Sequence, residues 1–217
     1  MPQNPVSKQG LIFDLDGTLV DTLPDIARAI NLARGSFDLP ELPVKEIVRH
    51  VGSGTEFLAR HTIPVAPESF PEAHRRYLAF YDQHMLDESV LHEGVEPILE
   101  RFRERSLAVI TNKPERQTEK ILAAAGVRSY FNVVLGGDAL EKMKPDPLPL
   151  LHYMRLEGLR PAEVVMIGDG INDIRAGKAA GVMTLGVTFG VAEREELLAE
   201  GADGVIDKME ELTGWIL

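Results

Sequence analysis

The chain has 217 residues, of which 44% are apolar, and it contains no cysteine. This length and apolar share indicate one large globular domain, or a core domain with a smaller partner, and exclude a largely disordered chain. The lack of cysteine excludes disulfide bonds, thiolate nucleophiles and cysteine-based zinc sites, and a formal net charge of −11 argues against a basic nucleic-acid groove. No apolar run reaches the ~18 residues of a membrane span and no secretory signal is visible, so we expect a cytoplasmic protein without a membrane partner.

Short apolar runs rich in β-branched residues predict five buried strands. Helical patterns separate most of these strands, and several of the helices have a proline near the start and a glycine at the end. Strand–helix alternation of this kind predicts an α/β fold with a doubly wound parallel sheet. The predicted strands are residues 11–15, 107–111, 133–135, 164–167 and 183–187.

The interval between the first two strands is too long for one crossover. It has roughly 90 residues, whereas a whole βαβ unit takes about 30. Helical patterns at residues 23–33, 44–51, 55–60 and 71–85 fill it, and prolines mark its turns. We therefore expect an inserted all-helical domain at residues 20–92, and a core made of residues 1–19 and 93–217.

Apolar residues of the insertion, such as Phe57, Phe70 and Tyr77, belong either to its core or to a dimer contact. We favour the core. The sequence leaves open whether the protein is a monomer or a homodimer.

Polar side chains follow four of the predicted strands at their carboxyl ends. Ligands of open parallel sheets bind at that edge. Asp14 and Asp16 are two residues apart in extended chain, and Asp169 and Asp173 are four apart at a helix start, so each pair shares a side. The spacing predicts a single site. Its members are Asp14, Asp16, Thr111, Asn112, Lys144, Asp169 and Asp173.

Each of these residues also has an ordinary structural interpretation. Asp169 could cap a helix, and Asp16-Gly17 could be a turn. Two aspartates ending an apolar strand are costly without partners, however, which favours a site. The segment 168–173 lacks the third glycine of a dinucleotide fingerprint, and residues 52–54 have no strand before them, so neither predicts a nucleotide loop.

Four ordered segments resemble the motifs of the haloacid-dehalogenase superfamily. The resemblance covers nearly the whole chain, and implies a Rossmann-like core with an α-helical cap between the first two motifs. Within the superfamily, residues 13–22 and 136–138 are similar to phosphoglycolate phosphatases. Gly170 departs from the pattern, because many relatives have a hydroxyl side chain there. The four segments are Asp14-Leu-Asp16-Gly17-Thr18, Thr111-Asn112, Lys144-Pro145-Asp146-Pro147 and Gly168-Asp169-Gly170-Ile171-Asn172-Asp173.

The resemblance implies a phosphatase mechanism in which Asp14 attacks phosphorus and forms an aspartyl phosphate. Asp16 is implied to be the general acid for the leaving group and then the general base for water. Thr111, Lys144 and the backbone N–H of Asn112 are implied to hold the phosphoryl oxygens.

Charge predicts a cation at the same place, since a carboxylate that approaches a phosphate dianion is repelled. Oxygen ligands favour Mg²⁺. We expect Mg²⁺ to be held by the Asp14 carboxylate, the Asp16 main-chain carbonyl and Asp169. Asp173 is expected to orient Lys144 or a metal-bound water.

The cap is expected to close over the core, with hinges near residues 20–22 and 92–94. Gly52, Ser53 and Gly54 precede a predicted helix, so their N–H groups are candidates for substrate binding, although the segment could be only a turn. Arg49, His50 and Arg60 are further basic candidates nearby.

The expected function is hydrolysis of a small phosphorylated metabolite, with 2-phosphoglycolate implied by resemblance alone. Three alternatives stay open: a phosphosugar mutase, a pyrophosphatase or nucleotide phosphatase on the same core, and a non-enzymatic phosphate-binding or receiver-like module. A dehalogenase is disfavoured, because enzymes of that kind lack the second aspartate, here Asp16.

Overall fold

The core is a six-stranded sheet with strand order β5-β4-β1-β6-β7-β8, in which all neighbouring strands are parallel. The computed structural model describes residues 5–217. β1 is central and wholly buried, as its uninterrupted apolar run predicts. The strands are β1 (Gly10–Phe13), β4 (Ser106–Ile110), β5 (Val133–Leu135), β6 (Val164–Gly168), β7 (Met183–Val187) and β8 (Gly204–Ile206).

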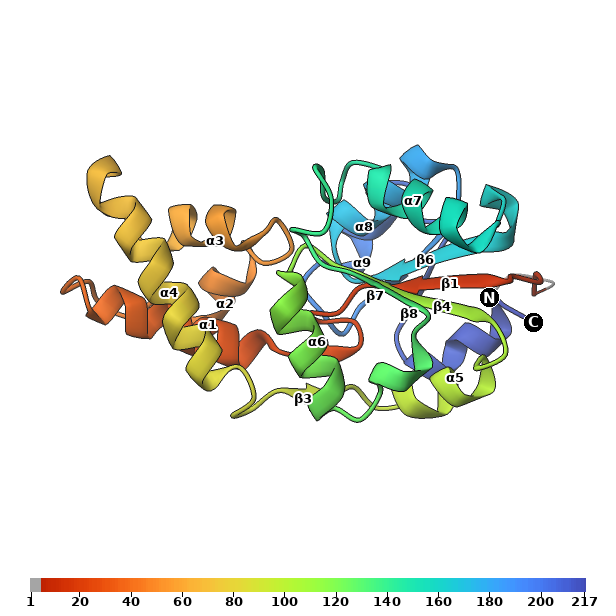
Figure 1. Ribbon diagram of the computed structural model, residues 1–217, viewed down its shortest axis with the longest axis horizontal. Helices are drawn as coiled ribbons and strands as arrows, with labels where there is room; N and C mark the ends of the chain where they lie inside the picture. The colour runs from red at the N-terminus through yellow and green to blue at the C-terminus, as the bar shows by residue number, and fades with distance from the viewer. Residues whose placement is uncertain (1–4) are drawn as a thin grey trace.

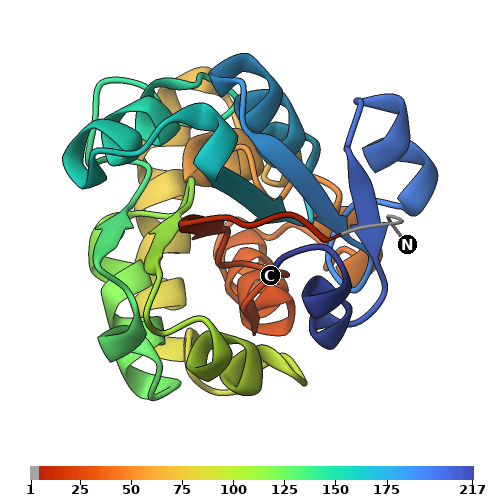
Figure 2. The ribbon, with the colours of Figure 1, turned by 90° about the vertical axis from the view of Figure 1, so that its right-hand side faces the viewer.

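Helices cover both faces of this sheet, as the turned view shows (Figure 2). α7 and α8 lie over one face, while α5 and α6 lie over the other (Figure 1). Neighbouring residues of β1 serve different layers: Ile12 packs with α7 and α8, whereas Leu11 and Phe13 pack with α5 and α6. The core helices are α5 (Val95–Arg101), α6 (Glu115–Ala124), α7 (Leu148–Glu157), α8 (Ile171–Ala180) and α9 (Arg194–Ala199).

The remaining four helices form a cap beside the sheet (Figure 1). The chain enters the cap through β2 (Val20–Asp21) and returns through β3 (Val90–Leu91), which pair as antiparallel neighbours. Within the cap, α1 packs along α4, and α4 also contacts α3. The cap helices are α1 (Leu23–Gly35), α2 (Val44–Val48), α3 (Thr55–Thr62) and α4 (Phe70–His84).

The fold class, a doubly wound parallel sheet with an inserted helical cap, is confirmed. The exact cap limits, residues 20–92, stay a prediction. Of the apolar cap residues, Phe70 and Tyr77 are buried as expected. The expectation for Phe57 is wrong, because its side chain is 41% exposed and its ring lies against His61 on the cap surface.

Element ends differ from the predicted ones where hydrogen bonds close a turn. The first strand stops at Phe13 rather than at residue 15, because the carbonyl of Leu15 accepts backbone N–H groups from residues 18, 19 and 20. β8 and α9 were not predicted. Residues 201–206 contain only two large apolar side chains, Val205 and Ile206, which is too weak a pattern for an edge strand.

Candidate active site

Asp14 stands directly after the central strand, at the place where the chain order of the sheet reverses direction. β1 lies between β4, which is followed in the sheet by β5, and β6, which is followed by β7. Ligand sites of open α/β sheets lie outside the carboxyl ends of strands at such a switch point. The Asp14 N–H still donates to the Ile167 carbonyl, and its Oδ1 accepts the Leu15 N–H at 2.7 Å. The carboxylate is therefore anchored to the end of the strand.

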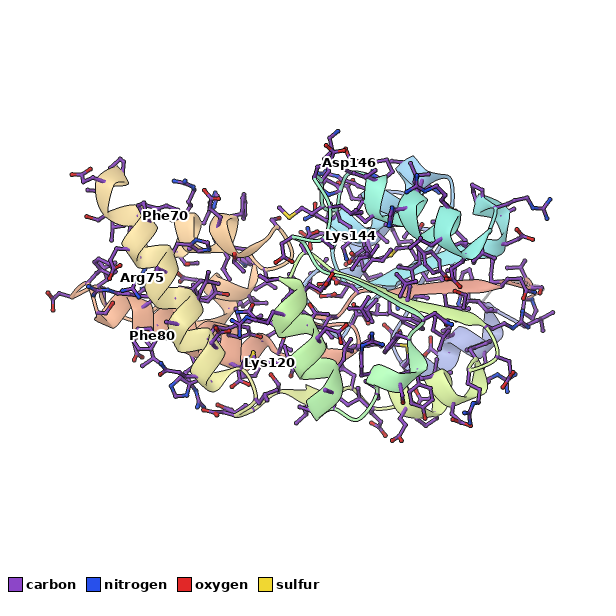
Figure 3. The ribbon with its side chains drawn as sticks, in the orientation of Figure 1. Phe70, Arg75, Phe80, Lys120, Lys144 and Asp146 are labelled. Carbon is purple, nitrogen blue, oxygen red and sulfur yellow. The ribbon has the colours of Figure 1, made fainter. Side chains whose placement is uncertain are left out.

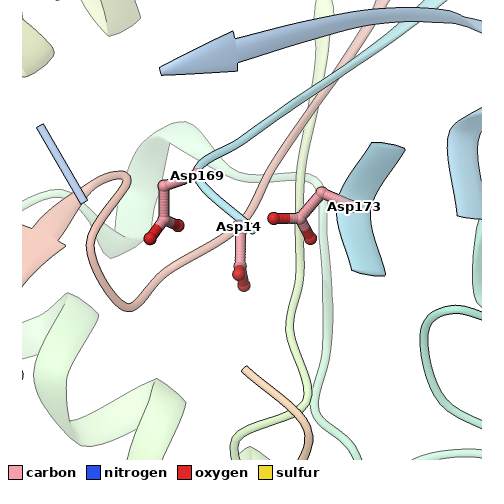
Figure 4. A group of neighbouring side chains, drawn as sticks. All are labelled: Asp14, Asp169 and Asp173. Carbon is pink, nitrogen blue, oxygen red and sulfur yellow. The ribbon is translucent and has the colours of Figure 1, made fainter. Parts of the chain in front are cut away.

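Three buried carboxylates from three segments meet at this edge (Figure 4). Asp14, Asp169 and Asp173 each offer an oxygen within 4.8 Å of the others. Asp169 follows β6, and Asp173 lies in the first turn of α8. The predicted convergence of these strand ends is thus present in the structure.

Lys144 is the cation at the centre of this group. Its side chain is 1% exposed, and its Nζ lies 2.6 Å from Asp173 Oδ1 and 3.0 Å from Asp14 Oδ1. Figure 3 shows Lys144 where the core faces the cap. Asp173 contacts Lys144, and its expected role of orienting this lysine stays a prediction.

The electrostatics of the cluster show an excess of negative charge. Burial, together with the neighbouring Asp14 and Asp173, raises the pKa of Asp169 well above its ordinary value. Burial also raises the pKa of Asp173 to about 6, although Lys144 opposes the change. Burial alone would lower the pKa of the Lys144 ammonium, but Asp14 and Asp173 outweigh it and the pKa is raised.

This donor set fits a divalent cation. Three buried carboxylates share one ammonium, so one divalent ion would neutralise the charge that remains, and hard oxygen donors suit ions such as Mg²⁺ or Mn²⁺. The structure therefore supports a divalent metal at Asp14 and Asp169, with Asp173 close by.

Asp169 is held by four residues from two remote segments, 17–18 and 190–191. The Thr18 hydroxyl donates to its Oδ1 at 2.7 Å, and the Val191 N–H donates to its Oδ2 at 2.8 Å. Gly17 and Gly190 press against the same carboxylate: a Cβ atom at either position would lie within 2.4 Å of Asp169 Oδ2. Only glycine fits there, and Gly17 also has a φ of +76°.

Asp16 has a different environment from Asp14, although it is only two residues away. Its carboxylate oxygens lie 2.8 and 2.9 Å from Lys113 Nζ, and the Thr22 hydroxyl donates to it at 2.5 Å. Neither Lys113 nor Thr22 was predicted as a site residue. Lys113 follows Thr111 and Asn112 at the end of β4, so the rule that found its neighbours could have found it as well.

Asn112 and Asn172 connect the core to the cap loop at residues 51–54. The Asn112 side-chain amide donates to Gly52 O at 2.8 Å and to Lys144 O at 2.7 Å. Asn172 donates to the same Gly52 carbonyl and to the Ser53 hydroxyl, each at 3.0 Å. The loop therefore rests on the core through its carbonyl and hydroxyl oxygens. Asn172 was not singled out in the sequence, because its position in a helical first turn is typical of an ordinary cap residue.

The other predicted site residues lie around one cavity between cap and core. Thr111 is buried beside Asp14 and Asp16, and Gly52 and Gly54 line the cavity from the cap side. Of the basic candidates, Arg49 lines an adjoining open cleft together with Ser53. His50 stacks on His61, and Arg60 pairs with Glu56, so these two have structural partners within the cap.

A family model described as haloacid dehalogenase-like hydrolase matches residues 11–187. The chain belongs to this family. The predicted family, and with it the prediction of a phosphatase-like enzyme, is confirmed.

Several members of the haloacid dehalogenase-like family resemble this chain over almost its full length. A phosphoglycolate phosphatase from Chromobacterium violaceum is 36% identical over 214 residues, which are 94% of each chain. One from Haemophilus influenzae is 34% identical and covers 92% of this chain and 94% of its own length. The crystal structure of a predicted phosphoglycolate phosphatase from Haemophilus somnus has a TM-score of 0.91 at 29% identity, covering 95% of this chain and 97% of that one.

Within residues 5–217, no helix is long and apolar enough to cross a bilayer. The cytoplasmic location stays a prediction.

Proposed function

We propose that this protein is a Mg²⁺-dependent phosphomonoester hydrolase that acts on a small phosphorylated metabolite through an aspartyl-phosphate intermediate. The buried group of Asp14, Asp169, Asp173 and Lys144 carries the proposal, because it combines an anchored nucleophile, ligands for a cation and a fixed ammonium. We take 2-phosphoglycolate as the substrate, because relatives at 34–36% identity are named phosphoglycolate phosphatases.

The first step is attack of an Asp14 carboxylate oxygen on phosphorus. The Asp14–phosphorus bond forms, the ester P–O bond breaks, and the leaving oxygen takes a proton from Asp16. Lys144 holds the phosphoryl oxygens with the Thr111 hydroxyl and the Asn112 N–H. Since the Asp14 Oδ1 atom is bound by Leu15 N–H and Lys144, Oδ2 is the oxygen that stays available for attack.

The second step removes the phosphoryl group from Asp14. Asp16 takes a proton from a water molecule, the water oxygen bonds to phosphorus, and the bond between phosphorus and Asp14 breaks. Acid–base help of this kind contributes typically 10²–10⁴-fold, so most of the acceleration comes from positioning and charge stabilisation.

The residues that would hold Mg²⁺ are Asp14, Asp169 and the main-chain carbonyl of Asp16. When bound, the ion supplies positive charge that offsets repulsion between the carboxylates and the phosphoryl group. Thr18 and Val191 orient Asp169 toward this role, and Lys144 keeps Asp173 turned toward the same group.

The test is phosphate release from 2-phosphoglycolate, pyrophosphate, nucleotides and sugar phosphates, each with Mg²⁺ and with EDTA. We expect Mg²⁺-dependent release with 2-phosphoglycolate as the best substrate. Conversion of a sugar phosphate into its isomer without phosphate release would instead support a mutase. No Mg²⁺-dependent release from any compound would overturn the proposal in favour of a binding module.

A further inference from the structure

The cavity between cap and core has a distinct arrangement of charge. Asp14 and Asp16 lie on its core side, and Ile26, Leu58 and Tyr77 form an apolar wall on the cap side. Among residues 5–217, Lys113 is the only cation that lines it. Lys144 serves the phosphoryl end and is occupied by Asp14 and Asp173. If a substrate in this cavity has a second negative charge, the Lys113 ammonium is therefore the cation that can bind it.

Lys113 is held at a fixed position in the wall. Its side chain is 4% exposed, and its Nζ lies 4.5 Å from the centre of the Tyr81 ring. On its other side, the same Nζ contacts both carboxylate oxygens of Asp16. Contact with an aromatic face stabilises the ammonium in a site with little water, and the lysine is prepositioned rather than free to leave for solvent.

We propose that Lys113 determines specificity by binding a carboxylate of the substrate, which takes the place of one oxygen of Asp16. This inference rests on the proposed function and narrows it to short phosphorylated hydroxy acids. An ammonium has three N–H donors, so Lys113 can hold a substrate carboxylate while keeping one contact with Asp16. The released Asp16 oxygen then faces the leaving group, while Thr22 still anchors Asp16.

The connectivity of 2-phosphoglycolate matches this arrangement. One oxygen and one methylene separate its phosphorus from its carboxylate carbon, so its two charged groups lie close together, and Asp14 and Lys113 line the same cavity. A phosphate ester without a carboxylate would leave the Lys113–Asp16 pair intact and would gain no binding energy from Lys113. The apolar wall of Ile26, Leu58 and Tyr77 offers no second cation to compensate for a buried charge.

The test compares two substrates in matched variants. 2-Phosphoglycolate has the carboxylate, and 2-hydroxyethyl phosphate has a hydroxymethyl group in its place. The variants are Lys113→Met, which removes the charge and keeps the length, Lys113→Arg, which keeps the charge, and Lys120→Met, whose exposed lysine lies on α6, the helix that begins two residues after Lys113. The readout is kcat/KM for each substrate and the ratio of the two values.

We expect the wild type and Lys120→Met to prefer 2-phosphoglycolate. Lys113→Met should lose about 10- to 100-fold of that preference, since a hydrogen bond between charged groups is lost, and Lys113→Arg should keep most of it. Equal losses on both substrates would overturn the proposal, because Lys113 would then act only by positioning Asp16. A wild type that releases no phosphate from 2-phosphoglycolate but does so from other esters would instead contradict the assigned substrate.

A second measurement does not depend on the folding of a charge-deleting variant. 3-Phosphonopropionate and propylphosphonate are non-hydrolysable and differ in the carboxylate. In the wild type and Lys113→Arg, the carboxylate compound should inhibit at an at least about 10-fold lower concentration. Equal inhibition by the two compounds would contradict carboxylate recognition.

Discussion

The hydroxyl of Thr18 donates a 2.7 Å hydrogen bond to Oδ1 of Asp169, across 151 positions of sequence. Thr18 lies in the turn after β1, and Asp169 lies at the end of the neighbouring strand β6. The bond joins the first and last of the four motifs, and it fixes the orientation of a carboxylate that would ligate the metal. Removing a hydrogen bond of this kind from a metal ligand typically lowers metal affinity by about 10- to 100-fold.

Substitution Thr18→Val is therefore expected to weaken Mg²⁺ binding by about 10- to 100-fold while keeping the side-chain volume. The Mg²⁺ concentration that gives half-maximal phosphate release measures the effect. Thr18→Ser retains the hydroxyl and is the matched control. Equal Mg²⁺ requirements in Thr18→Val and in the wild type would show that the Val191 N–H and the two glycines suffice to orient Asp169.

The pH dependence of stability should reveal the crowded carboxylates. Because burial raises the pKa of Asp173 to about 6 and that of Asp169 well above its ordinary value, these two carboxyl groups bind more protons in the folded protein than in the unfolded chain above ~3.9, the ordinary pKa of aspartate. Burial lowers the pKa of His50, His74 and His92, and these histidines act in the opposite sense below pH ~6.5. In EDTA, the contribution of Asp169 to the free energy of unfolding, taken as the difference between the wild type and Asp169→Asn, should therefore fall as pH rises from 5. The raised pKa of Lys144 does not alter this window, since its contribution is lost only above pH 10.

Thermal unfolding measured across that pH range, with EDTA and with Mg²⁺, checks the expectation. Mg²⁺ should raise Tm more at pH 8 than at pH 5, with each kcal/mol of stabilisation giving roughly 2–4 °C. Asp169→Asn should flatten the decline in EDTA and abolish the response to Mg²⁺. A difference in Tm between the wild type and Asp169→Asn that stays constant with pH in EDTA would refute the charge excess.

The side-chain amides of Asn112 and Asn172, which both donate to the Gly52 carbonyl, should hold the cap loop together. Asn172→Ala removes two hydrogen bonds to the cap loop, so we expect KM to increase by about 5- to 150-fold, at roughly 0.5–1.5 kcal/mol per bond. Cleavage of the loop near Ser53 in limited proteolysis should become faster. Asn112→Ala should lower kcat as well, because Asn112 also holds the Lys144 carbonyl.

A double-mutant cycle of these asparagines measures how far the two bonds depend on each other. Because both side-chain amides donate to the same Gly52 carbonyl, the effects of Asn112→Ala and Asn172→Ala on KM should be less than additive. Additive effects would mean that the loop is held mainly by contacts within the cap.

Strand ends could be located from the sequence with enough accuracy to find the acidic cluster. An error of two residues at the end of β1 did not affect the prediction of the cluster, because the residues that follow parallel strands all lie at the same edge of the sheet. The position of the insertion, between the first two strands of the core, was also predicted, and the paired strands β2 and β3 mark where the chain leaves and re-enters the core. The acidic cluster and the insertion could both be predicted because they depend on the order of the elements and on the spacing of apolar residues, and not on exact geometry.

Pairings between side chains could not be predicted in the same way. In the sequence, the position of Lys113 is typical of the start of a helix. Only the folded structure shows that its side chain contacts Asp16 and the Tyr81 ring. Asn172 is similar: its partners, Gly52 and Ser53, belong to the cap and lie about 120 positions earlier. Such contacts depend on how the cap sits on the core, which no local pattern specifies.

The most direct test of the central claim is identification of the residue that carries phosphate during turnover. Asp16→Asn should be mixed with p-nitrophenyl phosphate and Mg²⁺, because this leaving group needs little protonation while the loss of the base slows the second step. After acid quenching and borohydride reduction, peptide mass spectrometry should find the reduced side chain at position 14. Asp14→Asn treated in the same way should remain unmodified. A phosphorylated residue elsewhere, or normal phosphate release by Asp14→Asn, would contradict the mechanism.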